Sequence, residues 1–102
     1  MSRFVEVELA QGSIADVLVA LAALSLPFEH TGEAIMLQGG IECAGQPALV
    51  RIAAGTLGAC EDFGFVADAN GLAVLVCGEP DRTLLGERLL VPLRAELAKQ
   101  RL

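Results

Sequence analysis

The stretch Glu61–Gly78, EDFGFVADANGLAVLVCG, decides the fold of this chain of 102 residues. Apolar and polar side chains alternate in both of its halves, which is typical of half-buried β-strands. Asn70-Gly71 separates the halves, and this dipeptide tolerates the positive φ angles of a tight turn. The stretch therefore predicts a β-hairpin. We interpret its acidic residues, Glu61-Asp62 at the open end and Asp68 beside the turn, as solvated strand ends rather than as an acid/base site.

The turn leaves two strand registers open. A two-residue loop at Asn70-Gly71 pairs Phe65 with Val76, whereas a type I turn with Gly71 as a bulge shifts the pairing by one residue on one strand. In the first register Phe65 and Val76 lie on the face that the helices cover. Alternation then sends three apolar side chains to the opposite face of the sheet. These candidate interface residues are Val66, Leu75 and Cys77.

Patterns on either side of the hairpin predict the remaining elements. Strands are expected at residues 3–9, 34–38 and 48–53, and helices at residues 14–24 and from about residue 81 towards the C-terminus. Ser13 and Asp16 have the spacing of a capping box at the start of the first helix. The second helix contains Pro92, which predicts a kink or two helical pieces near residues 90–92.

These elements follow one another in the order β-α-β-β-β-β-α. A chain of this length has room for one hydrophobic core. Strands that follow one another without intervening helices favour an antiparallel sheet with its helices on one face. The sequence therefore predicts a single α+β domain over residues 1–102, with an antiparallel sheet of about five strands and two helices packed on one face.

The charge distribution argues against nucleic-acid binding. The formal net charge is −6, and the six Arg and one Lys are spread along the chain, whereas a phosphate backbone requires a clustered basic surface. The longest apolar run, Val17–Leu24, is far shorter than the ~20 residues that span a bilayer. The N-terminal residues lack the pattern of a signal peptide. We therefore expect a cytoplasmic protein, with neither nucleic acid nor membrane among its partners.

The cysteines do not indicate a cofactor or a disulfide framework. Cys43, Cys60 and Cys77 share no CxxC spacing, which a zinc site would favour. The acidic neighbours of Cys60 are expected to raise the pKa of its thiol. Cys43 lies in a glycine-rich loop without a cationic neighbour that would favour the thiolate. No GxGxxG or GxxxxGK[ST] motif is present, and no cofactor is expected.

His30 is the only histidine and the natural candidate for metal binding or acid/base catalysis. It lies in the polar segment Glu29–Glu33, between a predicted helix and a predicted strand. A site there requires partners from elsewhere in the fold, such as Cys43, Glu61 or Asp62. The simpler interpretation is a surface histidine on a loop. Accordingly, no catalytic, cofactor-binding or metal-binding residue is assigned, and His30 is the candidate ligand or acid/base group.

The apolar content points to a partner. Apolar residues make up 54% of the chain, above the ~45–50% of an average soluble domain. With both helices on one face of the sheet, nothing remains in the chain to cover Val66, Leu75 and Cys77 on the other. Contiguous exposed apolar surface usually marks an interface, and a two-fold dimer is the simplest closed arrangement. The expected partner is therefore a second copy or an unidentified protein.

Several short motifs carry a resemblance to a known family. They are Met1-Ser2-Arg3-Phe4, Leu24-Ser25-Leu26-Pro27 after the first helix, and Asp62-Phe63-Gly64-Phe65 before the turn. In these motifs and in its Leu-rich C-terminal helix, the chain resembles a small family of hypothetical open reading frames from algal chloroplast genomes, cyanobacteria and other bacteria. Arg3 stands where that family tends to have His, and the Tyr and Trp of its last strand and helix are missing. Because the family has no established activity, the resemblance bears on the fold.

The sequence therefore predicts a small binding or accessory module that self-associates and has no catalysis of its own. The alternative is a small enzyme or a metal-dependent protein that uses His30 with nearby carboxylates. The position of His30 in the fold separates the two, because a catalytic or ligating histidine must lie within hydrogen-bond reach of a suitable partner.

Overall fold

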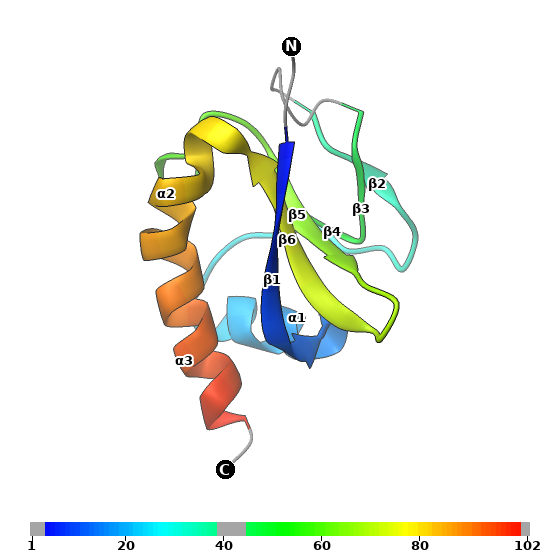
Figure 1. Cartoon of the computed structure of the whole chain (residues 1–102), viewed down its shortest axis with the longest axis vertical. Helices are drawn as coiled ribbons and strands as arrows, with labels where there is room; N and C mark the ends of the chain where they lie inside the picture. Colours follow the sequence, from blue (N-terminus) through cyan, green and yellow to red (C-terminus); the bar gives the residue numbers. More distant parts are fainter. Residues whose placement is uncertain (1–3, 39–44, 101–102) are drawn as a thin grey trace.

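The structure, a computed structural model, describes residues 4–38 and 45–100 (Figure 1). Its strands are β1 (Phe4–Ser13), β2 (Ile35–Met36), β3 (Pro47–Ala48), β4 (Val50–Ile52), β5 (Phe63–Ala67) and β6 (Leu72–Gly78). Its helices are α1 (Ile14–Ala23), α2 (Arg82–Leu85) and α3 (Val91–Lys99), with a π-helical turn at Gly86–Leu90 and 3-10 turns at Thr56–Gly58 and Glu79–Asp81. The predicted α+β class is confirmed. Among the described residues, no helix has the length and apolar character needed to cross a membrane.

The strands are divided between two sheets. The main sheet has the order β1-β6-β5-β4, and the second consists of β2 and β3. Every neighbouring pair is antiparallel, as predicted. β6 lies inside the main sheet and β1 forms one edge of it. The predicted single sheet of about five strands is thus a four-stranded sheet with a small additional one.

The hairpin of β5 and β6 adopts the bulged register. Phe65 pairs with Leu75 rather than with Val76, and Gly71 has a φ of +79°. Residues 69–71 form the loop, as in a type I turn followed by a glycine bulge. Phe65 lies under the helices as predicted. The placement of Val76 there was wrong, because one extra loop residue moves every side chain of the second strand to the other face.

The same shift corrects two of the candidate interface residues. Leu75 is 1% exposed and Cys77 is 0% exposed, and both belong to the core beneath the helices. Their assignment to a free face was therefore wrong. Val66 does lie on the opposite face, where it is half-buried. It packs against a second, smaller buried cluster made up of Leu37, Ala48 and Val76.

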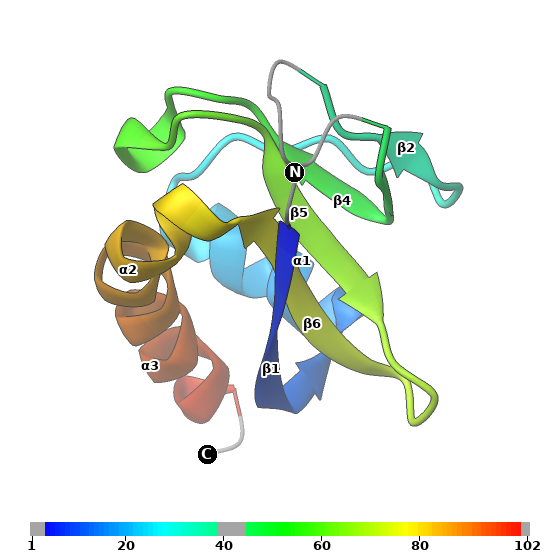
Figure 2. The same cartoon turned by 45° about the horizontal axis from the view of Figure 1, so that its top comes forward.

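The helices pack against the face of the main sheet that carries Phe65 and Leu75, around one core (Figure 2). α1 begins at the predicted capping box. The Ser13 hydroxyl accepts the Asp16 amide at 3.3 Å, and the Asp16 carboxylate accepts the Ser13 amide at 3.0 Å. These bonds satisfy two of the amides that a helix start leaves unpaired. α1 buries one side, through Val17, Ala20 and Leu21.

The C-terminal helical segment presents a leucine stripe to the same core. The stripe consists of Leu85, Leu89, Leu93 and Leu97. A strict four-residue spacing drifts by about 40° per step around a straight α-helix. The π-helical turn at Gly86–Leu90 takes one more residue per turn and so compensates for this drift. The turn ends at Leu90, two residues before Pro92, whose backbone nitrogen carries no hydrogen to donate. The predicted break near Pro92 is therefore a π-helical turn.

The second sheet partly covers the face that the helices leave open. Between β3 and β4 the chain passes very close to Gly64 of β5. A Cβ atom on Gly64 would lie only 2.0 Å from the carbonyl oxygen of Val50. Leu37, after β2, and Ala48, in β3, are 0% and 2% exposed, and they pack on Val76 of β6. A cover supplied by the chain itself was not predicted.

Candidate functional site

His30 lies on the exposed loop between α1 and β2. Of the partners considered for it, Asp62 is buried and bonded to other groups, as described below. Cys43 lies outside the described residues. Within residues 4–38 and 45–100, no group of three or more His, Cys, Asp or Glu side chains is arranged to hold a metal ion. The structure therefore places His30 on the surface.

The most organised polar group in the structure is the carboxylate of Asp62, which is 1% exposed. Its Oδ2 atom accepts the Gln38 amide at 2.6 Å and Arg51 Nε at 2.7 Å, and its Oδ1 atom accepts the Ala54 amide at 2.9 Å. Burial raises the pKa of Asp62, but the two amides and the guanidinium outweigh burial and leave that pKa below its ordinary value. Asp62 is therefore held as an anion and is poorly suited to accept a proton.

Arg51 extends this network to the loop after α1. Its guanidinium pairs with both Asp62 and Glu29, and its hydrogen bond to Asp62 is the largest cause of its raised pKa. Its backbone N–H and C=O also bond those of Glu29, at 3.0 and 2.8 Å. These contacts fasten the loop to β4.

A small pocket lies beside Arg51. It has a volume of about 120 Å³ and is lined by Pro27, Phe28, Glu29, Arg51 and Ala53. Small-molecule sites usually hold ~300 Å³ or more. Because the guanidinium is already shared between two carboxylates, this pocket offers no free cationic group to a substrate.

A second buried carboxylate, Asp81, organises the other end of the loop between β4 and β5. It is 2% exposed and accepts the amides of Cys60 at 2.9 Å and Glu61 at 3.3 Å. Glu61 itself is 5% exposed. The interpretation of Glu61 and Asp62 as solvated strand ends was therefore wrong, because both side chains are enclosed by the loops that meet at this end of the hairpin.

Neither of the two described cysteines is activated as a nucleophile. The thiol of Cys60 is exposed, and its hydrogen bond to Asp81 raises its pKa. Burial raises the pKa of the Cys77 thiol to about 11. Both thiols are therefore protonated at neutral pH, whereas the thiolate is the reactive form. The predicted direction for Cys60 is confirmed, although its main acidic partner is Asp81 and not the adjacent pair in the sequence.

An apolar groove opens on the side of the sheet away from the helices. Its volume is about 240 Å³, and it is lined by Ala34, Pro47, Ala48, Leu49, Val66 and Ala67. It lies between β3 and the C-terminal end of β5, where the chain has left the main sheet at Leu49. Val66 is the one candidate interface residue that the structure places at this groove. The other lining residues were missed because the path of β2 and β3 across the sheet was not predicted.

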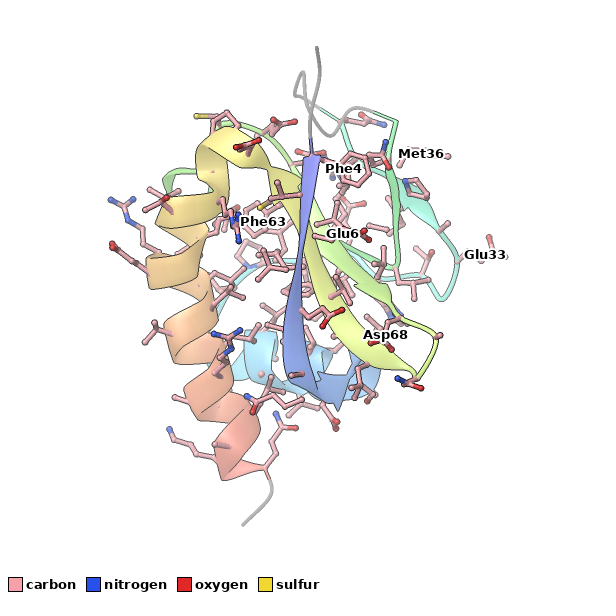
Figure 3. The ribbon with its side chains drawn as sticks, in the orientation of Figure 1. Phe4, Glu6, Glu33, Met36, Phe63 and Asp68 are labelled. Atoms are coloured by element: carbon pink, nitrogen blue, oxygen red, sulfur yellow. The ribbon has the colours of Figure 1, made fainter. Side chains whose placement is uncertain are left out.

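Two acidic residues are sequence neighbours of residues that line this groove. Glu33 precedes Ala34 and Asp68 follows Ala67, so each carboxylate is one residue away from the lining. Figure 3 shows Glu33 and Asp68 on the side of the molecule that holds β2 and the hairpin, away from α2 and α3. The basic residues that the structure describes are Arg51, Arg82, Arg88, Arg94 and Lys99. None of them lines the groove. Only Arg51 is outside the C-terminal helical segment, and it is held by Asp62 and Glu29.

Comparisons with known proteins do not assign the chain to a family. No protein-family model matches it, and neither a curated protein nor a solved structure matches it. The resemblance to hypothetical open reading frames stays a prediction.

Proposed function

We propose that this protein is a small cytoplasmic binding module that docks on another protein and has no catalysis of its own. The observation that carries the proposal is the apolar groove beside Val66 and Ala67. Its volume of about 240 Å³ falls below that of an ordinary small-molecule site, but it suits a side chain of a partner. Met36 pairs with Pro47 and is 54% exposed, although it is not among the residues that line the groove.

The state of the ionisable groups supports the non-catalytic part of the proposal. Asp62 is an anion engaged by three donors, and Cys60 and Cys77 are protonated thiols. The alternative, an enzyme or metal-dependent protein using His30, requires a ligand set around that histidine. No such set is assembled in the part of the chain that the structure describes.

Comparative co-purification from the native host tests this proposal. The wild-type protein is compared with Ala67→Arg, a change at a residue that lines the groove and presents its strand edge, and with Ala98→Arg, a matched change on the exposed side of α3. Both alanines are exposed, so the two variants should fold equally well. We expect a protein, identified by quantitative mass spectrometry, that accompanies the wild type and Ala98→Arg and is lost with Ala67→Arg. The same set of proteins with all three would contradict docking at the groove.

A second copy is the other candidate partner, and the outer edge of β1 favours it. The Glu8 carbonyl accepts a hydrogen bond from Arg94 at 3.3 Å, so even-numbered residues of β1 direct their backbone groups away from β6. Phe4 and Glu6 therefore present unpaired N–H and C=O groups at an edge that has no strand partner among the described residues. Phe4 is 39% exposed. We propose that two copies pair through this edge.

Sedimentation equilibrium tests the edge-paired dimer. Glu6→Pro removes an outward N–H without removing a bond between β1 and β6, and proline is tolerated at such edge positions. We expect a dimer for the wild type at tens of micromolar and a monomer for Glu6→Pro, with Glu8→Gln as the control that remains dimeric. A wild-type monomer at those concentrations would exclude self-association through β1.

A further inference from the structure

The surroundings of the groove define the chemistry of its partner. We infer that the groove binds an extended segment of a partner protein in which apolar side chains are flanked by Lys or Arg. This inference rests on the proposed function and adds the class of ligand to it. Three features carry it: the apolar lining, the strand edge at Ala67 that no described strand pairs with, and the two carboxylates next to lining residues in the sequence.

The lining of the groove determines which side chains of the ligand can be buried in it. All six lining residues are apolar (Ala34, Pro47, Ala48, Leu49, Val66 and Ala67), and the space between them is about 240 Å³. Removing an aliphatic side chain from water into such a lining favours binding. An open groove of this size therefore accommodates one or two aliphatic side chains of a peptide.

The strand edge sets the conformation of the ligand. The Asp68 amide donates to the Leu72 carbonyl at 2.9 Å, so even-numbered residues of β5 direct their backbone groups towards β6. Odd-numbered residues direct theirs to the other side, where the Phe65 carbonyl accepts the Leu49 amide at 2.9 Å. Ala67 is the next residue with this orientation, and the described pairing of β4 with β5 ends at Phe65. Its backbone groups are thus directed towards the groove, where an extended peptide can pair with them.

The carboxylates of Glu33 and Asp68 determine which residues of the ligand can stand next to its apolar side chains. Glu33 and Asp68 each adjoin a lining residue. The Oδ1 atom of Asp68 accepts the amides of Asn70 and Leu72, at 2.8 and 3.0 Å, which fixes this carboxylate at the turn. Cations next to the apolar side chains would pair with these two carboxylates, and none of the basic residues within 4–38 and 45–100 lines the groove.

The same charges argue against a second copy in the groove. A two-fold arrangement through this face would bring Glu33 and Asp68 of one copy close to those of the other. Like charges held close together oppose association. The groove therefore fits a basic partner, and self-association is left to the edge of β1.

Titration with three blocked peptides, followed by amide NMR shifts of the isotope-labelled protein, tests the inference. The peptides are acetyl-KKLVLKK-amide, the acidic acetyl-EELVLEE-amide and the neutral acetyl-SSLVLSS-amide. We expect the basic peptide to shift the amides of Ala34, Ala48, Val66 and Ala67, and to bind more weakly as salt is added. The acidic peptide should leave these amides in place, and the neutral one should bind less tightly than the basic one.

Matched variants show whether the two carboxylates are responsible. The double variant Glu33→Gln/Asp68→Asn keeps the turn, because the Asn amide oxygen can still accept the turn amides. We expect it to bind the basic peptide about ten-fold more weakly, about three-fold for each exposed ion pair removed. The control Glu79→Gln/Glu87→Gln makes the same change in net charge at exposed positions of the C-terminal segment and should bind as tightly as the wild type.

The outcomes separate this inference from the proposed function. Equal binding of the acidic and basic peptides at the groove, or unchanged binding by Glu33→Gln/Asp68→Asn, would overturn the basic partner while supporting docking at the groove. Shifts spread over the whole surface, or none at the groove, would overturn the inference. Co-purification with Ala67→Arg tests the proposed function independently of either result.

Discussion

Gly64 shows at the level of one residue how the open face of the sheet is covered. It lies in β5 and pairs with Val76 on one side and with Arg51 on the other. A side chain here would meet the Val50 carbonyl oxygen at 2.0 Å and Ala48 Cβ at 3.2 Å. The absence of a Cβ atom is thus what allows the chain to pass from β3 to β4 directly over the sheet.

Gly64→Ala is expected to destabilise the protein by about 1–3 kcal/mol or more, because an added methyl group cannot be accommodated without moving backbone atoms. Gly86→Ala is the control. A Cβ atom there meets nothing within 4 Å, so its effect should be small or stabilising, as helix propensity favours Ala over Gly. Denaturant unfolding measures both. Equal stabilities of the two variants would show that β3 and β4 do not cross at Gly64.

Asp62 is expected to contribute to the loss of folding stability as the pH is lowered. Its pKa is lowered in the folded state, so the unfolded chain binds the proton more tightly than the folded chain. The stabilisation is therefore fully present above the unfolded pKa of about 3.9 and is lost as pH falls towards the lower, folded value.

Asp62→Asn should cost about 3 kcal/mol at neutral pH, because it leaves the guanidinium of Arg51 with a weaker partner in a half-buried site. The variant should also lose less stability than the wild type between pH 5 and pH 3. Urea unfolding across this range measures both effects. Parallel curves for the two proteins would show that Asp62 is not the group that titrates.

The buried carboxylates illustrate what could not be predicted residue by residue. Alternation correctly placed Asp62 at the end of a strand, but its donors come from Gln38, Arg51 and Ala54, between 8 and 24 positions away. Burial of a carboxylate depends on whether such donors converge on it. Convergence is a property of the loops, and the local pattern of the sequence does not encode it.

At the scale of elements, the hairpin was predictable from the sequence, but two registers of its strands remained possible. Asn70-Gly71 located the turn, and both possible loops were consistent with it. The structure selects the loop of residues 69–71, with Gly71 at a φ of +79°. One residue of loop length reversed the faces of Leu75 and Cys77, since side chains alternate strictly along a strand.

Gly71→Val should destabilise the protein by more than about 1 kcal/mol, because a β-branched residue is strained at positive φ. A Cβ atom at this position meets nothing within 4 Å, so strain of the backbone is the only cause to consider. Ala69→Val, in the same loop and exposed, is the control. An unchanged melting midpoint for Gly71→Val would refute the bulged turn.

Pro92 and the leucine stripe make a prediction for the C-terminal segment. Proline inside a regular helix costs ~3 kcal/mol, so replacing it would normally be stabilising. Here we infer that the four-residue leucine spacing favours the π-helical turn at Gly86–Leu90 whether or not proline follows. Pro92→Ala should therefore change the free energy of unfolding by less than about 1 kcal/mol. A gain of about 3 kcal/mol would show that proline alone imposes the turn.

At the scale of the whole molecule, the layers were predictable and the groove was not. The alternating strands and the leucine stripe of the last helix indicated a sheet with helices on one face, and the structure has that arrangement. Residues 48–53 were expected as one strand, but they divide at Leu49 into β3 and β4. That break sends β2 and β3 across the sheet and creates the groove. Only Val66 was anticipated at it, because its place depends on strand alternation and not on the path of the loops.

Cys77 is a probe of the cooperativity of the whole fold. It is 0% exposed, between β1 and β5 in the main sheet and beneath the helices. Its thiol has a pKa of about 11. A buried, protonated thiol reacts only when the structure around it opens. Because both layers must separate to expose Cys77, its labelling should report global unfolding.

In a Cys43→Ser background, thiol labelling at neutral pH should therefore show two widely separated phases. Cys60, which is exposed but bonded to Asp81, should label from the folded state more slowly than a free model thiol, because its raised pKa leaves little thiolate. Cys77 should label with an opening free energy equal to that from denaturant unfolding. Fast labelling of Cys77 under native conditions would mean that β1 detaches on its own. Labelling of Cys60 faster than the model thiol would instead reveal an activated nucleophile and contradict the non-catalytic function proposed above.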